Sequence, residues 1–240
     1  MKNLSLQKFF IVVLPRYSML GFILCVILAM YLYPGGIYHY ALGTHQCIID
    51  SCQEKGHFTD GYLFFKNFLS DLGRTISHGG DNNFHSSLLF NIALTFGGLT
   101  YILFFSFVKN LFPNQILAKL GSVLGICGAI SFIGVAFTPA DLYLDAHIIA
   151  NHWIFRFFLL STVIYSWLIY KENRIDNRYL IGNIIFIISL LAYILILIWG
   201  PMPNQPGGLE FQAVAQKLIM FNFIASIIVQ TMAFDKIMND

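Results

Sequence analysis

The chain is predicted to be an all-α, polytopic membrane helix bundle with six transmembrane helices and an amphipathic helix at the outer interface. The first observation is composition: 57% of its 240 residues are hydrophobic and only 11% are charged. A soluble domain has about 25% charged residues, because it must cover its surface. The second observation is a set of separate apolar runs, each near the roughly 20 residues that cross a bilayer.

These runs divide a single membrane domain, residues 1–240, into helices and loops. The spans are expected at about 16–33, 85–108, 117–137, 149–170, 179–199 and 213–234, with a long outer loop at 34–84. Pro15 and Arg16 should separate the first span from a short interfacial stretch, Leu6 to Leu14. No small-residue cleavage site follows that span, so we expect it to be permanent rather than a signal peptide.

Three spans carry further patterns. Gly121, Gly125 and Ala129 place small residues along the third span, which predicts a central, closely packed helix. The fifth span is almost entirely Ile, Leu and Phe and should face lipid most. Polar residues recur every fourth position in the sixth span, which favours hydrogen bonds between helices over a polar conduit. They are Asn222, Ser226 and Gln230.

Orientation follows from the distribution of Lys and Arg, which are enriched on the cytoplasmic side. With both termini in the cytoplasm, the inner side holds nine of these residues and the outer side five. The inner set is Lys2, Lys8, Arg16, Lys109, Lys119, Lys171, Arg174, Arg178 and Lys236. The outer set is Lys55, Lys66, Arg74, Arg156 and Lys217. We therefore expect a multi-pass protein, with the bacterial inner membrane as its location.

The same orientation places most of the titratable side chains on one side. All seven histidines and eight of the twelve acidic residues fall on the outer side. The histidines are His39, His45, His57, His78, His85, His147 and His152. Binding or chemistry is accordingly expected outside the cytoplasm.

The outer loop contains two features. Cys47 and Cys52 form a C-x4-C pair on the oxidising side, where a local disulfide is favoured over a metal pair. In residues 62–75 the apolar and polar side chains fall on opposite faces at helical spacing, which predicts an amphipathic helix lying at the interface. Its polar face, which includes Asp71 and Arg74, either is solvated or lines a cavity.

The second outer connection is predicted to begin a helix at Thr138, with Pro139 at the first helical position. If that helix continues, four polar residues share one face. They are Asp141, Asp145, His152 and Arg156. Because a guanidinium within the membrane is nearly always paired, Asp71, Asp141 or Asp145 is expected to pair with Arg156.

Two function classes follow from these residues. The preferred one is an outer polar cavity that binds a lipid headgroup or small amphiphile, with Arg residues suited to phosphate or carboxylate. Its expected ligand-binding residues are Asp71, Arg74, His85, Asn91, Asp141, Asp145, His147, His152 and Arg156. The alternative is a metal-dependent hydrolase. Its expected zinc ligands are His85, His147, His152 and Asp141.

The sequence assigns no catalytic residue and leaves the cofactor and the oligomeric state open. His147 and His152 are five apart, whereas zinc-binding helices usually space two histidines by four. The sequence contains neither a nucleophile-elbow motif nor a phosphate-binding glycine loop. A net charge of +2 provides no basic field for nucleic acid.

The order of short motifs resembles a broad group of six-helix membrane proteins. The carriers are Ser70-Asp71-Leu72-Gly73 before the second span, Asn91 within it, and Asp141 followed by His147. The group includes the DRAM and FGF-receptor-activating-protein-like families and an uncharacterised prokaryotic relative. The resemblance implies a six-span bundle and a connection to membrane lipid or sterol handling. A more distant likeness is to membrane hydrolases that use Ser, Asp and three His around zinc.

Overall fold

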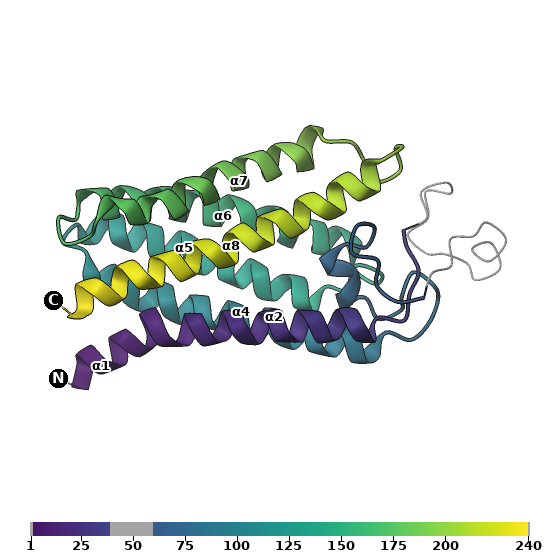
Figure 1. The fold of residues 1–240 in the computed structure, drawn as a ribbon, viewed down its shortest axis with the longest axis horizontal. Helices are drawn as coiled ribbons and strands as arrows, with labels where there is room; N and C mark the ends of the chain where they lie inside the picture. The colour runs from purple at the N-terminus through teal and green to yellow at the C-terminus, as the bar shows by residue number, and fades with distance from the viewer. Residues whose placement is uncertain (1, 39–59, 240) are drawn as a thin grey trace.

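The structure is a computed structural model that describes residues 2–38 and 60–239, and its helices run side by side along one axis (Figure 1). Six helices are long and apolar enough to cross a membrane. The first is the continuous stretch Ser5–Leu32. The others are α4 (Phe84–Val108), α5 (Gln115–Phe137), α6 (Leu144–Lys171), α7 (Leu180–Trp199) and α8 (Gly208–Asn239). The predicted six-span helical bundle is confirmed.

The first span differs from the prediction because it is not interrupted at Pro15. Helix α1 (Lys2–Lys8) leads through a widened turn, η1 (Phe9–Val13), directly into α2 (Leu14–Leu32). Within that turn the Leu14 N–H bonds to the Phe9 carbonyl, five residues back. Proline has no N–H to offer the carbonyl four residues before it, and a π turn accommodates that loss without ending the helix.

Helix α5 is closely packed, as its small residues predict, but it is not the central helix, because α4 and α6 are the two spans that it contacts extensively. It packs against α4 on one side and α6 on the other. A Cβ atom added at Gly125 would lie 2.5 Å from the Phe105 ring of α4, so the two helices approach too closely for any larger residue there. Ser122 donates a hydrogen bond of 2.6 Å to the Phe105 carbonyl. These contacts confirm the third span as a closely packed helix.

Helices α7 and α8 form an antiparallel pair joined by polar side chains. Asn222 donates to the Ser189 hydroxyl at 2.6 Å, and Gln230 donates to the Asn183 side-chain oxygen at 2.8 Å. The predicted stripe on the sixth span therefore makes interhelical hydrogen bonds. Helix α7 is the least buried of the six spans, which fits its expected position against lipid.

Both termini lie at the same end of the bundle (Figure 1). There Asp235 of α8 pairs with Lys8 at 2.9 Å and with Arg16 at 3.5 Å, which ties the last helix to the first. We call the opposite end, which carries the 60–83 segment, the distal end. The distal end holds the polar network described next.

Two sequence-predicted elements at the distal end are wrong, and one lies outside the described residues. The segment at 62–75 is a set of turns with one 3-10 helix, η3 (Leu69–Gly73), and not an amphipathic α-helix. The fourth span, α6, begins at Leu144 rather than at Thr138. Thr138 instead caps the end of α5, and its hydroxyl donates to the Gly134 carbonyl. The predicted Cys47–Cys52 disulfide falls in residues 39–59, outside the described part of the chain.

Candidate functional site

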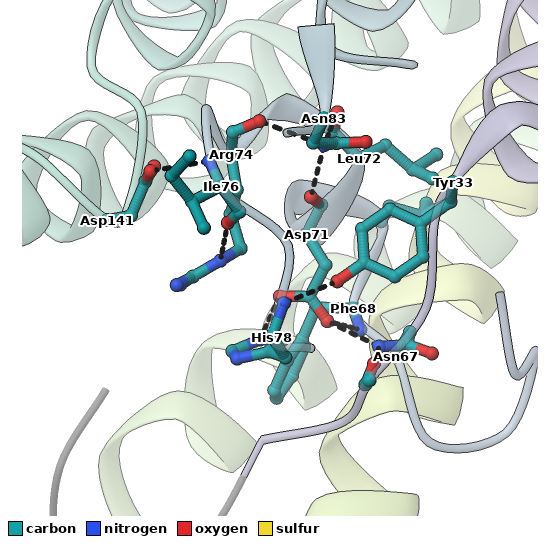
Figure 2. A network of polar contacts seen from close by, with 12 residues as sticks. Tyr33, Asn67, Phe68, Asp71, Leu72, Arg74, Ile76, His78, Asn83 and Asp141 are labelled. Atoms are coloured by element: carbon teal, nitrogen blue, oxygen red, sulfur yellow. Dashed lines mark hydrogen bonds and ion pairs between the residues drawn. The ribbon is translucent and has the colours of Figure 1, made fainter. Parts of the chain in front are cut away.

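The distal network is built around the buried carboxylate of Asp71, in η3 (Figure 2). One carboxylate oxygen lies 3.0 Å from His78 Nε2. The other accepts the Phe68 N–H at 2.8 Å and the Asn67 amide at 3.2 Å. Each of these donors comes from the 67–78 segment, so the carboxylate folds that segment around itself. Local side-chain bonds of this kind compete with the helical backbone pattern and explain why no α-helix forms.

The environment of Asp71 stabilises its charged form. Burial alone would raise the pKa of this carboxyl, but the adjacent His78 and Arg74 and the Asn67 hydrogen bond outweigh burial. The net result is a pKa below the ordinary value for aspartate. The Asp71 carboxylate is thus an anion whose two oxygens both accept hydrogen bonds from the protein.

Asn83, the residue before α4, attaches the network to the bundle. Its amide nitrogen donates to the carbonyls of Arg74 at 2.8 Å and Leu72 at 3.1 Å. The Thr75 carbonyl in turn accepts the Asn83 backbone N–H at 3.0 Å. These bonds fix the end of η3 against the start of the second span.

Asp141, in the turn between α5 and α6, holds the same segment from the other side. Its carboxylate accepts the backbone N–H groups of Thr75 and Ile76, each at 3.0 Å, and the Thr75 hydroxyl. Partial burial alone would raise the pKa of this carboxyl. These hydrogen bonds and the nearby Arg74 charge outweigh burial, so the net pKa lies below the ordinary value for aspartate. Asp141 therefore serves as a tether for the 74–76 backbone.

Two neighbouring residues of α8 form hydrogen bonds to the same 60–83 segment. The Gln216 side-chain oxygen accepts the Leu69 N–H at 2.6 Å. The buried Lys217 ammonium donates to the Asn67 carbonyl at 2.6 Å and lies 5.1 Å from the centre of the Phe64 ring. Segment 60–83 is consequently bonded to α4, to the α5–α6 turn and to α8.

His147, near the start of α6, is buried beside this network. Its Nδ1 lies 2.7 Å from the Thr138 carbonyl. Because a carbonyl can only accept, Nδ1 carries the proton and Nε2 is left as a buried acceptor, with no hydrogen-bond partner among the described residues. The charges of Asp71, Arg74 and Asp141 all act on this ring.

The structure therefore gathers five of the nine predicted ligand-binding residues. They are Asp71, Arg74, Asn91, Asp141 and His147. Asn91 belongs to this group because its side-chain oxygen lies against Gly73, 3.3 Å from the position of an added Cβ.

Four predicted residues stand apart, for identifiable reasons. His85 and Asp145 are exposed on α4 and α6. Arg156 donates to the His152 carbonyl of its own helix at 2.8 Å, so the expected pairing with Asp71, Asp141 or Asp145 is wrong. The later start of α6 removes Asp141 from the helical face that was to carry Asp145, His152 and Arg156.

The four predicted zinc ligands do not come together either. Within residues 2–38 and 60–239, no three His, Cys, Asp or Glu side chains come together as a metal-binding group. His85 is exposed, and the Asp141 carboxylate is engaged by the 75–76 backbone. The four predicted ligands, all within the described residues, therefore do not form a zinc centre.

Several network residues were not predicted from sequence. They are Tyr33, Asn67, His78, Asn83 and Lys217. Asn67 and Asp71 are four apart and lie in the stretch predicted to be an amphipathic helix, whereas their side chains cap local turns. A signal was available in Asp71 itself, because an acid at the third position of a short helix often binds the backbone N–H before it.

Beneath η3 the bundle encloses a cavity of about 50 Å³. One water requires about 10–15 Å³ of such space, so the cavity can hold a narrow molecule larger than water. Its walls come from η3 and from helices α4 to α8. Leu69 and Ser70 of η3 form its distal end, directly below the Asp71 network.

Apolar and aromatic side chains line the whole cavity, whereas its polar side chains are confined to one end. Polar side chains line it only near the distal end; they are Ser70, Asn151 and Gln216. Its inner end is formed by Phe158, Phe186 and Phe223. The centre of the Phe223 ring lies 5.3 Å from that of Phe158 and 5.6 Å from that of Phe186. Asn151 to Phe158, like Gln216 to Phe223, spans seven residues, or about 10 Å along a helix.

This fold and its spans define a multi-pass integral membrane protein, whose described distal end closes over an apolar cavity. No known protein family, curated protein or solved structure matches the chain.

Proposed function

We propose that this membrane protein binds a small single-chain amphiphile in the cavity beneath η3. The observation that carries the proposal is the gradient of lining polarity: amide and hydroxyl groups lie only at the distal end, and about 10 Å further in the lining is entirely apolar. Such a gradient matches a molecule with a polar head and an apolar tail. Ligand sites are typically apolar with a few placed polar groups that fix orientation.

The head of the ligand lies at the distal end, and its tail points toward the middle of the bundle. The distal network itself supports this arrangement as a cover rather than as the headgroup site. Its carboxylates, Asp71 and Asp141, already accept hydrogen bonds from the protein, which favours the cavity over the network as the ligand site.

Filling the cavity should abolish binding. Met220→Trp places a bulkier side chain in the lining, whereas Leu218→Trp, two residues away, adds the same group on an exposed face of α8. The probes are a photoactivatable medium-chain alcohol and the matching carboxylic acid, each displaced by an excess of its unlabelled form. We expect saturable labelling of cavity-lining peptides in the wild type and in Leu218→Trp, and at least about tenfold less in Met220→Trp.

Two outcomes would contradict the proposal. One is labelling confined to the exposed helix faces; the other is cavity labelling that an unlabelled competitor cannot displace. Melting curves of both variants confirm that each is folded, since overpacking a core by itself costs about 1–3 kcal/mol.

The distal end is proposed to face away from the cytoplasm, with both termini inside. The nine-to-five excess of basic residues supports this orientation. A cysteine introduced at Asn173, between α6 and α7, should resist a membrane-impermeant maleimide in intact cells, and one at Asp81 should react. The four native cysteines are replaced by serine for this test. Reaction at position 173 from outside would reverse the orientation.

A further inference from the structure

The polar end of the cavity is uncharged. None of the described residues that line the cavity is Asp, Glu, Lys, Arg or His. Its polar groups are two amides and one hydroxyl, on Asn151, Gln216 and Ser70. A charged head at this position would lose its water without gaining a counter-charge, which is the costliest form of burial.

Backbone partners fix which way each amide points. Asn151 contacts the His147 carbonyl at 3.2 Å, and a carbonyl only accepts, so the contacting atom is the Asn151 nitrogen. Gln216 contacts the Leu69 N–H at 2.6 Å, which only donates, so the contacting atom is the Gln216 oxygen. The Asn151 oxygen and the Gln216 nitrogen make no hydrogen bond to any described residue.

The polar end thus offers one acceptor, from Asn151, and one donor, from Gln216, together with the Ser70 hydroxyl. From this pairing we infer that the ligand is an uncharged amphiphile whose head carries a hydroxyl group, such as a fatty alcohol or a monoacylglycerol. A hydroxyl has both a donor, which suits the Asn151 oxygen, and an acceptor, which suits the Gln216 nitrogen. A phosphate or carboxylate head, which the sequence favours through its arginines, satisfies the donor only.

This inference rests on the proposed function and is tested separately from it. Displacement of the photoactivatable alcohol is measured with competitors of equal chain length: an alcohol, a monoacylglycerol, a carboxylate at alkaline pH, an alkyl phosphate and an alkylammonium. The alcohol and the monoacylglycerol should compete at least about tenfold better than each charged compound. If the alkyl phosphate or the carboxylate competes as well as the alcohol while labelling stays saturable, the inference fails and the proposed function stands. If neither photoactivatable probe labels the cavity saturably, both fail.

A charge introduced at Asn151 provides a second, independent measurement. Asn151→Asp converts the neutral polar end into an anionic one, so the alkylammonium should become the best competitor and the alcohol should weaken. Asn222→Asp makes the same change on α8, where the side chain bonds to Ser189 outside the cavity, and should leave the order of competitors unchanged. An unaltered order in a folded Asn151→Asp protein would overturn the assignment of the polar end.

Discussion

Replacing Asp71 with asparagine is expected to destabilise the protein by about 3–5 kcal/mol, the usual effect of removing one partner from a buried, hydrogen-bonded charge pair. The carboxylate accepts from His78, Asn67 and the Phe68 N–H. An asparagine nitrogen cannot accept, so at least one of these groups must lose its acceptor or change its protonated form, and the buried negative charge is lost. Equilibrium unfolding in a denaturing detergent would measure the loss.

Asp81→Asn is the matched control, because it makes the same change on an exposed side chain of the same segment. It should alter stability by no more than about 0.5 kcal/mol, as surface substitutions usually do. Equal effects from the two substitutions would show that the Asp71 network does not stabilise the distal end.

Acid should weaken the same network in the wild type. The folded-state pKa values of Asp71 and Asp141 lie below their ordinary values, so their contribution is complete above the unfolded pKa of about 3.9. It is lost as the pH falls toward the folded pKa values, because the unfolded chain then binds more protons. Asp71→Asn should therefore show a shallower loss of stability than the wild type below about pH 5.

Gly36→Ala is the second substitution with a large expected effect, about 3 kcal/mol or more. Gly36 has φ +86°, which costs a residue with a side chain about 1–2 kcal/mol. Its added Cβ would also lie 2.1 Å from the Gly79 backbone nitrogen. The two backbone segments must then separate. This breaks the 3.1 Å hydrogen bond from the Gly79 N–H to the Gly35 carbonyl and the 2.8 Å hydrogen bond from the Asn67 amide to the Gly36 carbonyl.

Two other glycines separate backbone strain from steric contact in that experiment. Gly61 has φ +74° but open space at its Cβ position, so Gly61→Ala should cost only the strain, about 1–2 kcal/mol. Gly21 lies within α2 and also has open space, so Gly21→Ala should stabilise by about 0.5–1 kcal/mol. Any other order of the three variants in thermal melts would contradict the assigned packing of Gly36 against Gly79.

The sequence by itself determined the spans. Five of the six predicted segments agree with the observed helices to within about five residues at each end, because the thickness of the bilayer imposes the length of an apolar run. It also determined the close packing of α5 through Gly121, Gly125 and Ala129, since close helix approach requires small residues regardless of the rest of the fold. The first span extends further than predicted, because a π turn absorbs the effect of Pro15.

Only the tertiary structure decided the candidate site. The 62–75 segment has helical periodicity, yet Asn67 and Asp71 bond to nearby backbone and to His78, and those bonds replaced the helix with turns. Asp141 and the 75–76 backbone are separated by more than 60 residues, and local patterns carry no information about such a contact. The same holds for the cavity, whose lining comes from six elements and whose neutral polar end depends on which amide atoms the backbone occupies. Periodicity and hydropathy report one helix at a time, whereas a site between helices is specified by how their faces meet.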